Sequence, residues 1–294
     1  MITIDGLTTR DRDDALSFQK ADNGTSAVLG IHITDVVSTL GDLPLLDSVL
    51  KWCRERGASA YRDGTSTPML PTHLSHDIAS LNADGKSRPC VSLFLHLSLS
   101  HQKGSVWTVD RYEHACTRVH VVENITYDEF CGTSETSATW KRLRETLAAL
   151  SGVADSEGQV AWAMMEYNTH FARVVLDATA GTGADASLLR VQHDALKNAS
   201  LAKTAYGHFT SPLRRYADLH NQFVILSLLS TRSSQSENTR SALEREDVDM
   251  LNRRMTTLRQ FHTRYLVMDL AHRCMERPLD VTAQIDLPRD DEER

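Results

Sequence analysis

The alternation of apolar and polar residues predicts a β-sheet in the first half of the chain. Residues 28–33 form an apolar run, which is typical of a strand buried on both faces. Shorter strands are expected at residues 106–109 and 118–123. Residues 91–99 alternate strictly and predict a half-buried strand, whose inward face is made by Val91, Leu93, Leu95, Leu97 and Leu99.

In the second half of the chain, apolar residues recur at helical spacing. Residues 140–150 and 160–176 carry them three and four positions apart, and residues 248–268 carry the same stripe over a longer helix. Pro212 is expected to begin another helix, because proline is favoured in the first turn. A further helix is predicted at Leu43–Arg56. The whole pattern predicts an α/β (α+β) fold with a helical C-terminal half.

Composition and charge narrow the class of protein. Hydrophobic residues make up 41% of the 294 residues, which is enough for one large domain or two small ones. No apolar run approaches the roughly 18 residues of a membrane span, and the N-terminus lacks the features of a signal peptide. The five scattered cysteines form no CxxC pair, so they indicate neither disulfides nor a zinc site and favour a cytoplasmic location. With a net charge of −7, a polyanionic substrate would need a local basic patch or metal ions.

Four aspartates lie within the first fourteen residues: Asp5, Asp11, Asp13 and Asp14. Carboxylates this close repel one another unless a cation binds between them, and Mg²⁺ prefers oxygen ligands. Two such ions roughly 3.5–4 Å apart could activate a water and stabilise the leaving oxygen of a phosphodiester. A solvated acidic loop and a purely structural metal site are the alternatives, whereas the segment lacks the glycine and the closing glutamate of an EF-hand.

A second segment, residues 206–219, combines a candidate helix start with two arginines. Residues 210–212 would begin the helix, and Arg214 and Arg215 would lie in its first turn. A helix N-terminus beside arginine is a natural phosphate site. On this segment alone, a capped helix with surface arginines paired to Asp218 is an equally good interpretation.

Together the two segments resemble the RNB catalytic domain of the ribonuclease II / ribonuclease R family of 3′-5′ exoribonucleases. Six segments in the family's order carry the resemblance: the four aspartates, residues 32–36, Tyr61 with residues 68–75, residues 88–89, residues 125–127 and residues 210–219. The resemblance implies the RNB fold, an α/β (α+β) arrangement in which a mixed, mostly antiparallel sheet in the N-terminal half is surrounded by helices. We expect a single catalytic domain over residues 1–285 and a disordered tail at 286–294.

The resemblance also implies the activity and the role of each site residue. Members hydrolyse single-stranded RNA from its 3′ end to nucleoside 5′-monophosphates with two Mg²⁺ ions, for which Mn²⁺ is an alternative. Asp5, Asp11, Asp13 and Asp14 would hold the metals, and Asp13 would be the most critical to the chemical step. Arg214 would bind the scissile phosphate, and bases would stack on Tyr61 and Tyr127, although core packing is the alternative for both tyrosines. Further RNA contacts are expected from Arg88, Thr210, Ser211 and Arg215.

Two departures from the family pattern affect the expected function. The cold-shock and OB-fold RNA-binding modules of the family are not expected in this chain. We therefore expect distributive degradation, or a separate RNA-binding protein as a partner. In addition, Trp162 stands where the family has a glutamate that helps to recognise ribose, so discrimination between RNA and DNA is less strongly implied than the chemistry.

Three other functions stay open at this point. A catalytically silent RNB-like regulator would bind RNA or a protein without hydrolysis, which the presence of Asp13 and Arg214 argues against. A metal-dependent phosphoesterase that acts on DNA or small nucleotides would be consistent with Trp162. A globular scaffold with a structural metal is the third alternative.

Overall fold

The computed structural model describes residues 1–22, 24–41, 46–62, 65–100, 106–132, 138–179, 206–230 and 245–276. The expected tail at residues 286–294 therefore lies outside the described residues. Contacts between Cα atoms divide the chain into two compact units, Met1–Met255 and Thr256–Arg294, and the single domain over residues 1–285 stays a prediction. Among the described residues, no helix combines the length and the apolar character that crossing a bilayer requires.

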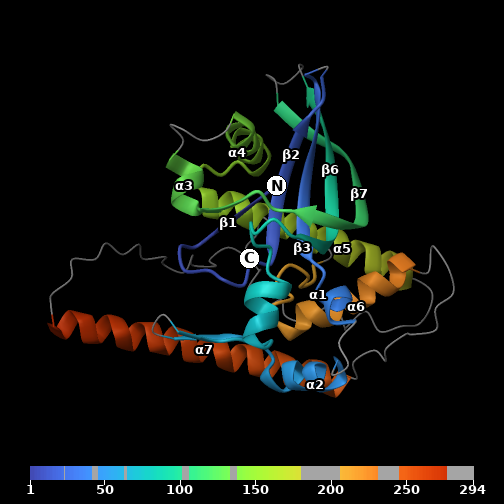
Figure 1. Cartoon of the computed structure of the whole chain (residues 1–294). Coiled ribbons are helices and arrows are strands. Elements are labelled where there is room, and N and C mark those ends of the chain that lie inside the picture. Colours follow the sequence, from blue (N-terminus) through green and yellow to red (C-terminus); the bar gives the residue numbers. More distant parts are fainter. Residues whose placement is uncertain are drawn as a thin grey trace, which may run out of the picture. The chain divides into compact units, whose positions relative to one another are not determined.

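A six-stranded sheet forms the centre of the first unit (Figure 1). Its strands are β1 (Ile2–Asp5), β2 (Asp14–Lys20), β3 (Ser26–Thr34), β6 (Ser87–Ser100), β7 (Val106–His120) and β8 (Glu123–Thr126). They follow the order β7-β6-β3-β2-β1-β8, and all neighbours are antiparallel except the parallel pair β1 and β8. The expected mixed, mostly antiparallel sheet is confirmed. A separate two-stranded sheet consists of β4 (Ala60–Arg62) and β5 (Thr65–Thr67).

Strand β7 is much longer than the two short strands that we expected at residues 106–109 and 118–123. It continues through residues 110–117 because it pairs with β6 along its whole length, with one register shift between His96 and Leu97. As an edge strand of the sheet, β7 has mostly exposed or half-buried residues. Its middle section therefore carries no apolar alternation from which a strand could be predicted.

Seven α-helices lie within the described residues, and the first six of them belong wholly to the first unit. Their bounds are α1 Val36–Gly41, α2 Leu46–Arg56, α3 Tyr127–Gly132, α4 Ala138–Ser151, α5 Ser156–Thr179, α6 Tyr216–Ser230 and α7 Arg245–Glu276. A π-helical turn, η1, occupies Leu74–Ile78. The helices predicted at residues 140–150, 160–176 and 248–268 are confirmed, whereas residues 43–45 of the predicted Leu43–Arg56 helix lie outside the described residues.

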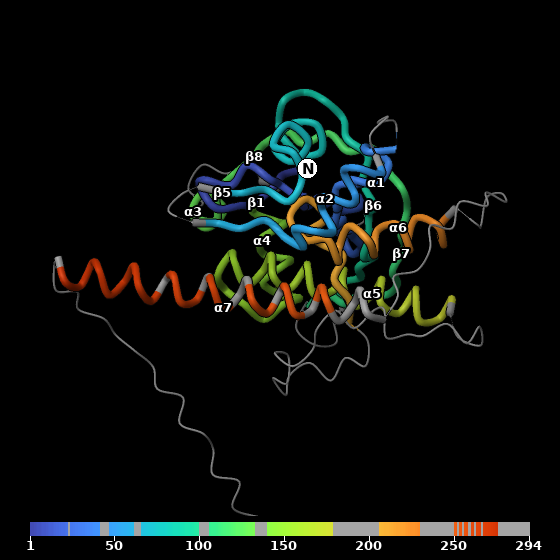
Figure 2. Tube along the Cα trace, turned by 90° about the horizontal axis from the view of Figure 1, so that it is seen from below, coloured from blue at the N-terminus to red at the C-terminus, as the bar shows by residue number. Residues whose placement is uncertain are grey.

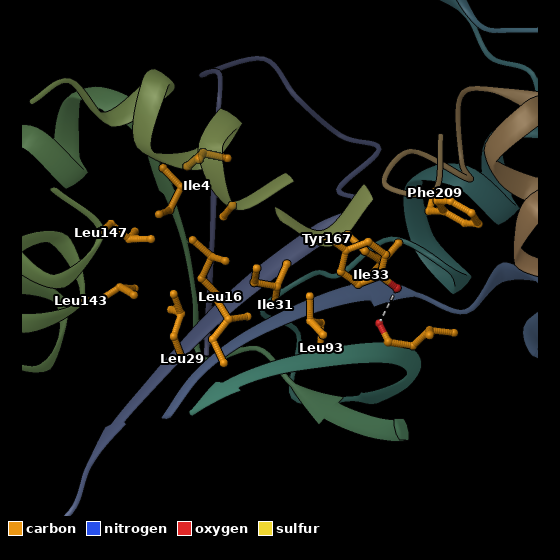
Figure 3. Packing of buried hydrophobic residues seen from close by; sticks show 14 of the residues in the cluster. Ile4, Leu16, Leu29, Ile31, Ile33, Leu93, Leu143, Leu147, Tyr167 and Phe209 are labelled. Atoms are coloured by element: carbon orange, nitrogen blue, oxygen red, sulfur yellow. Dashed lines mark hydrogen bonds between the residues drawn. The ribbon is translucent and has the colours of Figure 1, made fainter. Parts of the chain in front are cut away.

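The main core lies between one face of the sheet and helices α4 and α5 (Figure 3). Leu16, Ile31 and Leu93 follow one another in register across β2, β3 and β6, and each is at most 1% exposed. Full burial of such side chains stabilises the fold by roughly 1.5–3 kcal/mol each. Helix α5 runs along the sheet (Figures 1 and 2), and its Tyr167 donates a 3.0 Å hydrogen bond to the carbonyl of Val91. This bond fixes α5 near the start of β6.

A second apolar cluster joins α1, α2, η1 and the start of α6. Its buried members include Val36, Cys53, Met69, Leu74, Leu213 and Tyr216. The cluster matters for function because burial of Leu213 and Tyr216 anchors both ends of the segment that carries the two predicted arginines.

Candidate active site

The ion pair between Asp13 and Arg214 is the centre of the candidate site. Asp13 lies just before β2 and is only 2% exposed. Its Oδ1 accepts a hydrogen bond from the backbone N–H of Leu213 at 2.8 Å, and its Oδ2 accepts one from Nε of Arg214 at 2.9 Å. One carboxylate therefore joins two segments that are far apart in the sequence.

Burial outweighs the arginine in setting the proton affinity of Asp13. Desolvation raises the pKa of Asp13 to about 7, although Arg214 and the N–H of Leu213 act in the opposite direction. The Arg214 side chain is 46% exposed, whereas that of Asp13 is 1% exposed. The arginine thus has one nitrogen on a buried anion and a large surface that is open to a ligand.

Asp5 and Asp14 lie beside this pair, at the end of β1 and the start of β2. Burial, followed by the negative charges of Asp5 and Asp13, raises the pKa of Asp14 to about 8. Burial also raises the pKa of Asp5, more than the Thr3 hydroxyl, Arg12 and Arg214 lower it. Among the described residues, Oδ2 of Asp5 has no hydrogen-bond partner, and Nε of Arg12 lies 3.8 Å from it. These carboxylates are close together and largely withdrawn from water, and the nearby arginines compensate their negative charges only in part.

Two tyrosines border the aspartates. Tyr61 of β4 is 41% exposed, and its hydroxyl donates a 2.6 Å hydrogen bond to Oδ2 of Asp11. Burial, and then this hydrogen bond, raises the pKa of Tyr61 above its usual value. Tyr127 begins α3, and burial followed by the charges of Asp14 and Asp5 raises its pKa to about 12. The structure therefore brings Asp5, Asp11, Asp13, Asp14, Arg214, Tyr61 and Tyr127 into one region.

The segment around Arg214 is a turn and not the first helical turn that we expected from Pro212. The N–H groups of Arg214 and Arg215 donate to the carbonyl of Ser211 at 3.2 and 3.0 Å. Helix α6 begins only at Tyr216. The predicted helix start at Pro212 is therefore wrong by four positions.

A bridge to a distant segment explains the late start of α6. The N–H of Ser59 donates to the carbonyl of Arg214 at 2.9 Å, and the N–H of Tyr216 donates to the carbonyl of Gly57 at 2.8 Å. Ala58 and Arg215 form an antiparallel bridge between these bonds. Gly57 has a φ of +76°, which other residues rarely adopt. This pairing competes with a local helix, and it sets the position of the Arg214 backbone.

Asp218 and Asn168 hold the same turn from α6 and α5. Asp218 is fully buried, and its Oδ1 accepts hydrogen bonds from the N–H of Ser211 at 2.9 Å and from Nη2 of Arg215 at 2.7 Å. Oδ1 of Asn168 accepts one from the N–H of Phe209 at 2.9 Å. Arg215, which we expected to contact RNA, is therefore paired with Asp218, and its side chain is 26% exposed.

Thr210 and Ser211 were also expected to contact RNA, but both are only 4% exposed. Nδ2 of Asn168 lies 3.4 Å from Oγ1 of Thr210 and donates to it. In this structure the two residues shape the turn from inside, and their burial does not favour contact with a ligand.

Arg88 is buried and bonded within the chain, which argues against the RNA contact that we expected from it. Its Nε donates to the carbonyl of Ile78, Nη1 to the carbonyl of Asn82 and to Oδ1 of Asp84, and Nη2 to the carbonyl of Asp77 and to Oδ2 of Asp84. The residue is 4% exposed. Because each N–H group has an acceptor, none is left for a phosphate.

The donor chemistry of the aspartates fits a divalent cation, although the side chains do not form a closed ligand set. Within the described ranges, no three His, Cys, Asp or Glu side chains converge closely enough to hold a metal ion. The unpartnered oxygen of Asp5 and the raised pKa of Asp14 are nevertheless what a bound cation would relieve. Asp11 and Asp13 already use oxygens for hydrogen bonds within the chain. The pair Asp5 and Asp14 fits Mg²⁺ best.

Two groups of this site were not predicted from the sequence. Arg12 lies within the aspartate cluster, where its Nη1 donates to Oδ1 of Asn82 at 2.9 Å. A cation between Asp11 and Asp13 in the sequence was a signal that could have been used. The N–H of Leu213, by contrast, carries no signal, because almost every residue has a backbone N–H.

Trp162 is partly buried and packs against the main core from α5. Glu166, one turn further along, accepts a 3.0 Å hydrogen bond from the hydroxyl of Tyr112 on β7. Glu166 therefore faces β7. It does not take the place of the ribose-binding glutamate that the family has at the position of Trp162.

Comparison with known proteins agrees with this architecture. The sequence matches the RNB domain over residues 1–156 and 142–231. It is 35% identical to DIS3-like exonuclease 2 of Caenorhabditis elegans over 162 residues, which are 50% of this chain and 19% of that protein.

Two solved structures share the fold. One is Mycoplasma genitalium RNase R in complex with ribose methylated single-stranded RNA, with a TM-score of 0.69 and 17% identity over 90% of this chain and 56% of that chain. The other is yeast Ssd1, a pseudonuclease, with a TM-score of 0.62 and 13% identity over 88% of this chain and 41% of that chain. This chain thus spans less than two thirds of each of these relatives. Because the RNB match covers most of its length, the chain belongs to the RNB domain family, the family of ribonuclease II and ribonuclease R.

Proposed function

We propose that this chain is a Mg²⁺-dependent 3′-5′ exoribonuclease that hydrolyses single-stranded RNA to nucleoside 5′-monophosphates. The observation that carries the proposal is the Asp13–Arg214 pair, a buried carboxylate on a half-exposed guanidinium, beside Asp5 and Asp14. A solvated acidic loop would not bury its carboxylates in this way. Membership of the RNB family supports the same activity.

In this proposal Asp5 and Asp14 hold Mg²⁺, and Asp11 and Asp13 are further ligands. When bound, the metal supplies an activated water and charge stabilisation for the phosphodiester. Without a cation, Asp14 would be largely protonated at neutral pH, because burial and its neighbours raise its pKa to about 8. The site is therefore suited to gain a cation and release a proton when substrate and metal bind.

Arg214 binds the scissile phosphate through the nitrogens that do not contact Asp13. Its Nε is held by Oδ2 of Asp13, so the planar guanidinium has a defined orientation before substrate arrives. The bridge to residues 57–59 and the hydrogen bonds of Asp218 fix the backbone of the same turn. Such a preorganised cation stabilises the negative charge that develops on the phosphoryl oxygens.

Tyr61 and Tyr127 contact the terminal nucleotides. The hydroxyl of Tyr61 is bonded to Asp11, which holds the exposed ring at the edge of the aspartate group. Stacking of a base on such a ring is tolerant of sequence and contributes roughly 1–3 kcal/mol. The enzyme is therefore expected to degrade RNA of any sequence.

The decisive experiment compares the chain with its Asp13→Asn variant on a single-stranded RNA with a free 3′ end. We expect 5′-monophosphates only with Mg²⁺, and a loss of at least about 100-fold in kcat for Asp13→Asn. Asp22→Asn, at an exposed aspartate just after β2, is the matched control and should keep full activity. Monophosphate release that persists in EDTA would contradict the proposal.

A catalytically silent RNA-binding regulator is the second candidate. Two observations favour it: a pseudonuclease shares the fold, and no three-ligand metal group forms among the described residues. The same experiment separates the two functions, because a regulator would retain RNA without shortening it at any Mg²⁺ concentration. A DNA oligomer of the same sequence, assayed in parallel, tests whether the chain discriminates between RNA and DNA with Trp162 at the position of the ribose-binding glutamate.

A further inference from the structure

A pocket of about 230 Å³ lies between β7 and α5, and none of its lining residues belongs to the proposed active site. It is lined by Tyr112, Glu166, Thr169, His170 and Arg173. Positions two apart on a helix do not share a face, so Glu166 and His170 point away from Asn168, which binds the turn before Arg214. Helix α5 therefore has one polar group directed at the proposed active site and another set directed at β7.

Thr169 gives the pocket an unused hydrogen-bonding group. The residue is 3% exposed, and its Oγ1 is buried without a hydrogen-bond partner among the described residues. A buried hydroxyl without a partner costs free energy, and such groups in native proteins are usually satisfied by water or a ligand. Thr169 lines the pocket, but its Oγ1 is itself buried, so a ligand there would reach this oxygen only if neighbouring side chains moved.

The other lining groups combine an aromatic surface, a cation and an acceptor. The rings of Tyr112 and His170 are stacked, with centroids 5.2 Å apart and planes 23° apart, and Tyr112 is 38% exposed. Burial, with His114 and Arg173 nearby, lowers the pKa of His170 to about 4, so this ring is neutral at pH 7. The exposed Arg173 is then the positive charge of the pocket, and Glu166, bonded to the Tyr112 hydroxyl, is its carboxylate.

We propose that this pocket binds a single nucleotide unit. The phosphate pairs with Arg173, the base lies against the Tyr112–His170 stack, and a ribose hydroxyl bonds to Glu166. The volume of about 230 Å³ leaves room for no more than one nucleotide unit. The choice of a nucleotide over another polar aromatic ligand rests on the proposed function. The unit is either a free nucleoside monophosphate or one nucleotide of an RNA strand.

Binding of adenosine 5′-monophosphate and of a five-residue oligoadenylate to the full chain tests this proposal. The measurement uses the Asp13→Asn background in EDTA, so that neither hydrolysis nor metal at the proposed active site contributes. We expect saturable binding by calorimetry, weakened about tenfold or more by Arg173→Gln. Tyr112→Leu, which removes the exposed aromatic ring from the pocket, should also weaken binding of both probes. Arg142→Gln, at an exposed arginine of α4, is the control and should change nothing.

The relative affinity of the two probes identifies the source of the nucleotide. Tighter binding of the oligoadenylate indicates one nucleotide of an RNA strand, and tighter binding of the monophosphate indicates a free nucleotide. The proposal is overturned if neither probe binds saturably, or if Arg173→Gln binds both with unchanged affinity. The exonuclease activity of the unmodified chain with Mg²⁺ is measured separately, so failure of the proposed function would be recognised independently.

Discussion

Arg214 has two tasks at once in the proposed site, and another cationic side chain could not perform both. Its Nε is bonded to buried Asp13, while 46% of its side chain remains exposed. A lysine has a single ammonium group and cannot present a planar fork to a phosphate while it holds Asp13. We expect Arg214→Lys to fold and to lower kcat on a short RNA about 10²–10³-fold, with Arg142→Lys as the control. An unchanged kcat would remove Arg214 from the proposed mechanism.

The raised pKa of Asp14 predicts a stability that depends on pH and metal. Its pKa is about 8 in the folded chain, against roughly 3.9 when unfolded, so the folded state binds the extra proton between these values. Asp14 therefore stabilises the folded chain at low pH, and this contribution to the free energy of unfolding is lost as the pH rises through about 8.

Thermal unfolding in EDTA from pH 5 to pH 9 tests this consequence. The melting temperature of the unmodified chain should fall with pH relative to that of Asp14→Asn, and Mg²⁺ should reduce the fall. Parallel curves for the two proteins would show that Asp14 does not titrate in this range.

Helices and strands that bury one regular face could be predicted from the spacing of apolar residues along the chain. The helical spacing of residues 160–176 and the alternation of residues 91–99 correspond to α5 and β6, because both elements bury a regular face. The start of α6 and the full length of β7 depend on pairing with residues 57–59 and with β6, which the sequence pattern does not contain. The aspartates and Arg214 were predictable as a group, whereas the buried partners of Arg88 were not.

Arg88 ties the segment after η1 to the start of β6, and this role predicts a loss of stability and not of RNA affinity. Arg88→Lys leaves at most three donors where the arginine serves Asp84 and three backbone carbonyls. We expect a loss of about 3 kcal/mol in the free energy of unfolding, measured in urea. Lys86→Ala, whose side chain is 69% exposed, should change it by less than about 0.5 kcal/mol. Weaker RNA binding by folded Arg88→Lys would instead support the original expectation of an RNA contact.

At the scale of the whole molecule, the proposed site concentrates charges in a chain that is acidic as a whole. Its net charge is −7, with 32 basic against 39 acidic residues. Two of the basic groups that we expected on RNA, Arg88 and Arg215, are paired with Asp84 and Asp218. Arg214 therefore has to attract a polyanion with little long-range help from the rest of the chain.

This charge balance predicts distributive degradation of long RNA. Few phosphate contacts give weak affinity, and each contact that is made releases counterions, so binding falls further as salt rises. On a 5′-labelled 30-nucleotide RNA at 150 mM salt, we expect a ladder of all intermediate lengths, and a rate that falls only gradually above 50 mM because few counterions are released. Addition of a tenfold excess of unlabelled RNA after the start should stop the labelled reaction within one or two nucleotides, because the enzyme dissociates between steps. If the labelled strands instead proceed to the shortest product without intermediates, the chain retains RNA between steps, and contacts beyond the proposed site must hold the strand.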